Sequence, residues 1–535
     1  MAFTVATFIA FTVLVAVLSW WKTRDDDLST KEGYFLAGRG LPGIVIAGSL
    51  MMTNLSAEQL VGTNGQAFAG NMSTMAWEAT SAFALIVLAF VFLPKLLRGG
   101  IATIPEFFEM RYDTFTMRLF SLLFLIAYVV TMLPTILYSG AVALVKIFDL
   151  ESMFGISYFS AITIICIGTG IIGMCYAVFG GLKAVAYSDT INGVGPILGI
   201  IALGKLDGGG FMAGLDHLIS ATPEKMNAWS APNALPPEVP WPLLLTGMFV
   251  NNLFYWATNQ SIIQRSLGGK NLAESQKGAI WAGFFKCLDV FVIVLPGIIA
   301  FQLLAANGQM DTSVGMAADQ AYPLLVMKVL PKPLMGFFAA VMFGAILSSF
   351  NSVLNSASTI FTLNVWQPIW GKQASNNKVV KVGQIFGTVV GVVSIAIAPF
   401  VMFFGTGIMN FINECWGFFS MPLLTAVLFG LLSKKAPAIA PKVVIPVHIV
   451  LYGLTKVIPF FSRFHYLYVV FALFVLECII YAICIKVCPR QLAWEMPDAK
   501  VMDMTPWKSG KVWAIACAAV VAIMYLIFSP LGIGA

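Results

Sequence analysis

Long apolar stretches separated by short polar segments recur along the whole chain. Most of them approach the ~20 residues that an α-helix needs to cross the hydrocarbon core of a bilayer. The pattern predicts an all-α polytopic membrane protein; a barrel is disfavoured because its strands are ~10-residue segments of alternating polarity. We expect about fourteen spans, at 2–21, 42–66, 73–94, 118–146, 157–181, 190–205, 241–264, 278–304, 334–366, 379–403, 408–432, 439–458, 465–487 and 511–530.

Basic residues are distributed unequally between the two sides of these spans. Most of the 31 lysines and arginines lie in loops that follow odd-numbered spans. Loops rich in Lys and Arg stay cytoplasmic, so both ends of the chain should face outward, in a plasma membrane such as a bacterial inner membrane. The first span lacks a basic leader and a small-residue cleavage site, so we interpret it as a retained helix. Span 190–205 is short, which leaves open a short helix or residues missing from the chain.

Polar residues interrupt spans that should otherwise be apolar. A charged side chain at bilayer depth costs about 2.5–3.5 kcal/mol, so it is normally functional, paired or in contact with water. The interrupted spans 42–66 and 241–264 each open a group of five spans. Interruptions at corresponding places in two halves indicate a transporter with broken helices and a site at the membrane midplane. The polar clusters occur at 51–62, 249–265 and 344–361.

The polar residues around Asn54 and around Glu78 each suggest a chemistry. Unwinding near Asn54 would free backbone carbonyls for a cation, and irregular backbone at this depth is tolerated only where it lines a cavity. Glu78 has Trp77, Thr80 and Ser81 as neighbours. An acid and hydroxyls can bind sugar hydroxyls while an aromatic ring covers the apolar sugar face, so this combination is typical of a sugar site.

Other polar residues in the spans also have structural explanations. Lys286 and Asp289 are three residues apart on one helix and can pair with each other. Alternatively, the Lys286 ammonium faces a solute hydroxyl and Glu78. Glu477 has no polar neighbours, and we expect it near a helix end or against another helix. Most serines and asparagines of 344–361 are expected to pack helices together.

Six stretches of the chain resemble, in the same order, the sodium/solute symporter family, in the branch of the bacterial and animal sodium/glucose–galactose cotransporters. They run from about 34 to 364: "YFLAGRGLPGIVIAGSLMMTNLSAEQLVG", "AWEATSA", "GIATIPEFFEMRY", "YAVFGGLKAVAYSD", "NNLFYWATNQSIIQRSLGGKNLAESQKG" and "AILSSFNSVLNSASTIFT". The resemblance implies a LeuT-type five-plus-five inverted repeat. The expected division is an accessory helix and cytoplasmic loop (1–41), a first repeat (42–206), an outer loop (207–240), a second repeat (241–432) and three C-terminal helices (433–535).

The resemblance also implies roles for individual residues. The solute would be bound by Asn54, Gln59, Glu78, Ser81, Asn252, Lys286 and Asn413. Gates would be formed by Trp77, Tyr255, Trp256, Thr63 and Met409. Sodium would be held by the carbonyls of Met52, Leu55 and Ala345 and the hydroxyls of Ser348 and Ser349, with Asp189 assisting. Oxygen ligands of this kind suit a hard monovalent cation. Sugar-transporting relatives commonly carry Gln at the place of Asn413, and Asn351–Ser352 gives no basis for a second sodium site.

The expected function is therefore sodium-coupled symport of a neutral, glucose- or galactose-like monosaccharide into the cell by alternating access, carried out by a monomer or weak oligomer. Glu78 together with Lys286 favours a neutral polyol, because a solute carboxylate would face Glu78. Inositol, sialic acid or an amino acid remain alternatives, as does, less favoured, a sugar sensor or channel of the same fold. An enzyme is disfavoured because the three histidines are isolated and no nucleophile–base pair or metal cluster is evident. Neither the cysteines nor the net charge of +6 indicates a metal site or nucleic acid.

Overall fold

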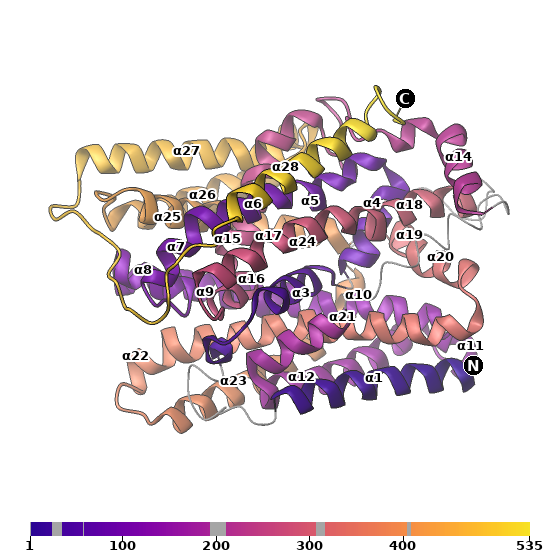
Figure 1. The fold of residues 1–535 in the computed structure, drawn as a ribbon, viewed down its shortest axis with the longest axis horizontal. Helices are drawn as coiled ribbons and strands as arrows, with labels where there is room; N and C mark the ends of the chain where they lie inside the picture. Colours follow the sequence, from indigo (N-terminus) through magenta and orange to yellow (C-terminus); the bar gives the residue numbers. More distant parts are fainter. Residues whose placement is uncertain are drawn as a thin grey trace.

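The computed structural model describes residues 2–23, 35–56, 58–192, 210–305, 316–403 and 408–534. These residues form a bundle of helices whose axes run broadly along one direction (Figure 1) and contain no β-strand beyond two isolated bridges. Among them, nine helices are long and apolar enough to cross a membrane, and one bent pair would make a tenth. The prediction of an all-α polytopic membrane protein is confirmed.

The predicted spans have helical counterparts, apart from 190–205, most of which lies outside the described residues. In chain order the counterparts are α1 (Ala2–Thr23), α3 (Gly43–Asn54) with α4 (Asn64–Ala69), α5 (Ala76–Ala79) with α6 (Ser81–Val87) and α7 (Leu93–Arg98), α9 (Thr114–Ile126) with α10 (Leu133–Ile147), α12 (Tyr158–Asn192), α15 (Gly247–Thr258) with α16 (Gln260–Leu267), α17 (Leu272–Asp289) with α18 (Leu295–Ala300), α21 (Lys332–Thr359), α23 (Asn376–Ile397), α24 (Ile408–Gly417) with α25 (Ser420–Leu432), α26 (Ile439–Val457), α27 (Tyr466–Val487) and α28 (Gly510–Ile527). Shorter helices in the connections are α8 (Ile104–Arg111), α11 (Leu150–Phe154), α14 (Phe211–Ala221), α19 (Met316–Asp319), α20 (Ala321–Val329) and α22 (Gln367–Trp370).

One connection that the sequence pattern predicts as a loop is helical in the structure. The sequence pattern places a connection between 157–181 and 190–205, but α12 continues as one helix to Asn192. Residues 182–189 contain no proline, so no residue in that stretch removes a backbone donor and forces the helix to end. Residues 193–209 lie outside the described part, and the predicted span there stays a prediction.

Three of the described spans are broken near their middle. The first bends by 61° between α3 and the segment that begins at Gln59. The second breaks at Asn259, whose backbone is extended between α15 and α16. The third breaks between α24 and α25, where Phe419 leaves the helical conformation. The breaks predicted for 42–66 and 241–264 are therefore present, and each leaves backbone groups that must be satisfied locally.

Neighbouring elements hold the outer half of the first broken span in place. A Cβ at Gly297 in α18 would collide with the Asn64 carbonyl, so glycine lets α18 approach α4 closely. Where α4 ends, the Lys225 ammonium donates to the carbonyls of Phe68 (3.0 Å) and Gly70 (2.6 Å). A lysine at a helix C-terminus satisfies carbonyls that have no partner within the helix. Burial lowers the pKa of Lys225 to about 8.

The inner half of that span packs into the other side of the bundle. The helix α3 contacts α12, α17 and α21, and α1 lies along α12 and α21 (Figure 1). On the C-terminal side, Glu477 of α27 pairs with His448 of α26 at 2.6 Å and accepts from the Thr425 hydroxyl of α25 at 2.8 Å. The expectation that Glu477 contacts another helix is thus confirmed. The His448 ring also bonds the Gly417 carbonyl (2.7 Å), at the end of α24.

Candidate functional site

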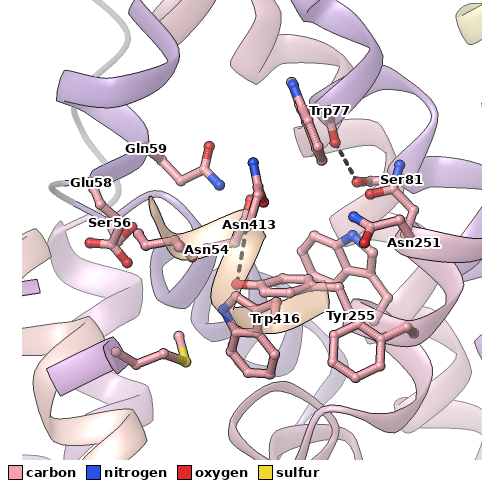
Figure 2. Close-up of a pocket in the computed structure, with 15 residues that line it drawn as sticks. Asn54, Ser56, Glu58, Gln59, Trp77, Ser81, Asn251, Tyr255, Asn413 and Trp416 are labelled. Carbon is pink, nitrogen blue, oxygen red and sulfur yellow. Dashed lines mark hydrogen bonds between the residues drawn. The ribbon is translucent and has the colours of Figure 1, made fainter. Parts of the chain in front are cut away.

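A polar and aromatic pocket lies where the three broken spans meet (Figure 2). About 650 Å³ of space, open solvent at its mouth included, lies between its lining residues. Of the predicted solute and gate residues, it is lined by Asn54, Gln59, Trp77, Ser81, Asn252, Tyr255, Trp256 and Asn413. Sequence reasoning did not assign Ser56, Glu58, Met132, Asn251, Phe254, Ile412 and Trp416, which line it as well.

Aromatic rings form one wall of the pocket. Tyr255 is half-buried and lies edge-to-face against Trp256, with ring centroids 5.4 Å apart. Phe254 and Trp416 pack edge-to-face at the same separation, from α15 and α24. Such rings present an apolar surface whose edges are polar, so this wall suits the C–H face of a cyclic polyol. The gate role of Tyr255 and Trp256 stays a prediction.

The pocket also offers hydrogen-bonding groups that are only partly used. Gln59 accepts from the Thr63 hydroxyl (2.8 Å), which leaves its amide nitrogen for another partner. Asn252 donates to the Thr80 hydroxyl at 2.7 Å, and the Ser81 hydroxyl donates to the Trp77 carbonyl at 2.8 Å. Two buried donors, Asn413 Nδ2 and Trp77 Nε1, have no hydrogen-bond partner among the described residues. Unpartnered buried donors are costly, so a ligand with acceptors would stabilise them.

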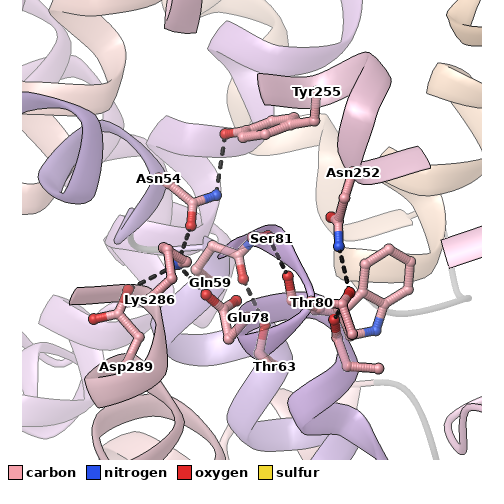
Figure 3. Close-up of polar contacts among 12 residues, drawn as sticks. Asn54, Gln59, Thr63, Glu78, Thr80, Ser81, Asn252, Tyr255, Lys286 and Asp289 are labelled. Carbon is pink, nitrogen blue, oxygen red and sulfur yellow. Dashed lines mark hydrogen bonds and ion pairs between the residues drawn. The ribbon is translucent and has the colours of Figure 1, made fainter. Parts of the chain in front are cut away.

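A buried ion cluster lies directly behind Asn54 (Figure 3). The Lys286 ammonium contacts Glu78 Oε2 and Asp289 Oδ2, the latter at 2.7 Å, and donates to Asn54 Oδ1. All three charged side chains are at most 1% exposed. Lys286 therefore contacts both carboxylates that the sequence suggested as partners, Asp289 and Glu78. Glu78 and Lys286 do not themselves line the pocket, and their predicted contact with solute stays a prediction.

The Asn54 side chain links this cluster to the pocket by hydrogen bonds. Its Oδ1 accepts from Lys286, so its Nδ2 points away from the cluster and donates to the Tyr255 hydroxyl at 3.2 Å (Figure 3). Lys286 also lies 5.8 Å from the centre of the Trp256 ring, within reach of a cation–π interaction. One amide thus connects the ion cluster to the aromatic wall.

A second polar region, the candidate cation site, lies where α3 ends against α21. Ser56 N–H, which would continue the helix by donating to the Met52 carbonyl, donates instead to the Asn54 carbonyl (2.7 Å). Across from it, the Ser349 hydroxyl lies 3.3 Å from the Thr53 carbonyl. The Ser348 hydroxyl is buried without a partner among the described residues. Carbonyl and hydroxyl oxygens gathered in this way are the ligands that a monovalent cation uses.

The remaining predicted residues divide into three groups. Thr63 is buried and bonds Gln59, one turn beyond the pocket. Leu55 and Ala345 are buried in the chain around the candidate cation site, and their carbonyl role stays a prediction. The side chains of Asp189 and Met409 lie outside the described part of the structure.

Some of the unassigned pocket residues carried a signal in the sequence. Trp416 is three residues after Asn413, which places the two on one face of a helix. Asn251 and Phe254 belong to the polar cluster at 249–265 and are one turn apart. Met132 carried none, because an apolar residue on a long membrane helix is indistinguishable from a packing residue.

Comparison with known proteins matches the chain to a transporter family. The model of the sodium:solute symporter family matches residues 34–439. The chain is 43% identical over 519 residues to the uncharacterized symporter YidK of Escherichia coli (strain K12), covering 96% of this chain and 88% of that protein. It is 32% identical over 454 residues to the sodium/glucose cotransporter of Vibrio parahaemolyticus, covering 81% of each. It is 33% identical over 466 residues to the sodium/myo-inositol cotransporter of Bos taurus, covering 81% of this chain and 63% of that one.

A solved structure shares the fold. The substrate-bound, outward-open state of a Na⁺-coupled sialic acid symporter superimposes with a TM-score of 0.76, covering 92% of this chain and 99% of that one. The two sequences are 19% identical, so the likeness concerns the arrangement of helices. It supports the LeuT-type fold predicted from the sequence.

The ion cluster generates a prediction about stability. Lys286→Met leaves Glu78 and Asp289 buried without a cation, which should cost about 3–5 kcal/mol. Glu78→Gln and Asp289→Asn each leave Lys286 one carboxylate, so both should cost clearly less. Thermal unfolding of the purified variants in detergent measures the order.

Lys146→Met serves as the control, because its pair with Glu151 (2.8 Å) is partly exposed and such pairs contribute at most about 1 kcal/mol. Equal unfolding temperatures for Lys286→Met and Glu78→Gln would show that Lys286 does not hold both carboxylates. Removing Lys286 and Asp289 together would still leave Glu78 unpaired, so the cluster does not reduce to one local pair.

Proposed function

Because the chain belongs to the sodium:solute symporter family, we propose that it imports a neutral polyol, a hexose or an inositol, together with sodium. Family membership makes the protein a multi-pass membrane transporter rather than an enzyme, with Na⁺ as the co-transported ion. It also agrees with the inner-membrane location, since the similar protein YidK is bacterial. The choice of solute class is the proposed step.

The observation that carries the choice of solute is the charge of the pocket wall. Among the described residues that line it there is no lysine, arginine or histidine. The nearby ammonium, on Lys286, is already shared between two carboxylates. An anionic solute such as sialic acid would thus meet no available cation, and burying an unpaired charge is costly. A neutral polyol needs only the amides, hydroxyls and rings that line this pocket.

The relatives support the same class of solute. Glucose and myo-inositol, the solutes in two of the relatives' names, are both uncharged six-membered rings with several hydroxyls. Such a ring offers C–H groups to the aromatic wall and hydroxyls to Gln59, Asn252 and Asn413. Because amides both donate and accept, they bind hydroxyls in several orientations.

The break in the first span explains how sodium and solute are coupled. The candidate cation site uses backbone from Met52 to Leu55, and the solute pocket uses Asn54 and Gln59 on either side of the same break. A cation that ties this backbone to Ser348 and Ser349 would stabilise the conformation in which the pocket is formed. Each ligand then raises the affinity for the other by the same factor.

The first test is uptake into proteoliposomes. We expect accumulation of labelled D-galactose, D-glucose or myo-inositol above the external concentration when sodium is higher outside. Replacing sodium with potassium should abolish accumulation. Accumulation of sialic acid in place of all three polyols would contradict the proposed solute class, and sodium-independent equilibration would indicate a channel.

The second test concerns the cation site. Ser349→Ala removes one oxygen ligand, and we expect it to raise the sodium concentration for half-maximal uptake about tenfold, as for a lost hydrogen bond to a charged group. Ser358→Ala on the same helix removes a hydroxyl that bonds the Gly383 carbonyl, and it should leave the sodium dependence unchanged. If both variants respond to sodium like the unmodified protein, the cation lies elsewhere.

A further inference from the structure

One buried carboxylate of the pocket has no role in the coupling described so far. Glu58 follows the break in the first span, and its side chain is 7% exposed. Its Oε2 atom has no hydrogen-bond partner among the described residues. A buried acceptor of this kind costs free energy in the empty protein. A ligand that donates a hydrogen bond to this oxygen removes that free-energy cost.

Glu58 lies in the wall of the candidate solute pocket. Glu58 lines the same pocket as Asn54, Gln59 and Asn413. In the view of Figure 2 it lies beside Ser56 on the left, across the pocket from Trp77 and Ser81 on the right. Its neighbours on this side of the pocket are Ser56 and Gln59, and the whole side chain is buried.

Glu58 differs from the two buried carboxylates of the ion cluster in having no basic partner among the described residues. Glu78 and Asp289 share the Lys286 ammonium, whereas Glu58 forms no ion pair with a described residue. Glu58 is also the one charged side chain among the residues that line the pocket.

We propose that Glu58 is a solute-contacting residue that makes the pocket select solutes with a hydrogen-bond donor at this point. The free oxygen accepts a hydrogen bond, so its partner is a hydroxyl of a neutral polyol or the ammonium of an amino sugar. A solute carboxylate at the same place offers no donor. This inference rests on the proposed function, since it concerns the same pocket.

Binding in saturating sodium tests the proposal with four probes: D-galactose, myo-inositol, D-glucosamine and D-glucuronate. We expect the unmodified protein to bind D-glucosamine and at least one neutral polyol, and not D-glucuronate. Glu58→Ala should weaken binding of the neutral polyol about tenfold or more. Glu58→Gln, which keeps the shape and replaces one carboxyl oxygen with an amide nitrogen, should weaken D-glucosamine more than the neutral polyol, because the new N–H groups face the ammonium.

Two controls separate this result from damage to the fold. Sodium binding measured without sugar should be the same in both Glu58 variants as in the unmodified protein. Glu109→Gln changes an exposed carboxylate of α8 that accepts from the Thr114 hydroxyl at the start of α9, and it should leave all four probes unaffected.

The outcomes distinguish this inference from the proposed function. If a neutral polyol binds and Glu58→Ala keeps its affinity within twofold, the role of Glu58 is overturned and the function stands. If D-glucosamine alone binds and Glu58→Gln loses it, the role of Glu58 stands and the neutral-polyol function is overturned. If D-glucuronate binds and neither neutral polyol does, both are overturned.

Discussion

A helix broken at membrane depth exposes backbone groups that lipid cannot satisfy, and the rest of this structure depends on how those groups are partnered. Irregular backbone is tolerated there only where it lines a cavity or is buried in protein. In the first span, Ser56 N–H turns back to the Asn54 carbonyl, and the Thr53 carbonyl faces Ser349 of α21. The break therefore forms the candidate cation site on one side and the solute pocket on the other.

The buried ion cluster gives this break a defined geometry. Lys286 joins Glu78 and Asp289, and it orients the Asn54 amide toward Tyr255. Four spans meet in these few contacts, so a shift of one span changes the partners of the others. Such a network is costly unless every member is paired, which makes it suited to a protein that alternates between two packed states. Glu58 lies outside this network, and its Oε2 atom has no hydrogen-bond partner among the described residues.

The sequence supported most of the helix positions because apolar stretches of membrane length are a strong signal. It also predicted a break near Asn54 and one within 241–264, since polar clusters lie inside those spans, but only the structure places the second break at Asn259. The continuous helix through residues 182–189 could not be predicted, because no local residue type distinguishes a loop from a long helix there. Family resemblance indicated Gln59, Ser81 and Asn252, and the structure brings them together at one pocket. It could not reveal that Lys286 pairs with two carboxylates at once, or that Glu58 pairs with no basic side chain among the described residues. Such pairing depends on the three-dimensional packing of separate spans.

The central claim is that sodium and solute meet on opposite sides of one break. The most direct measurement is reciprocal binding to the purified protein: the affinity for the best-bound polyol with and without sodium, and the affinity for sodium with and without that polyol. The account predicts that both affinities rise, and by the same factor, as linkage requires. Polyol binding that is unchanged when potassium replaces sodium would contradict it.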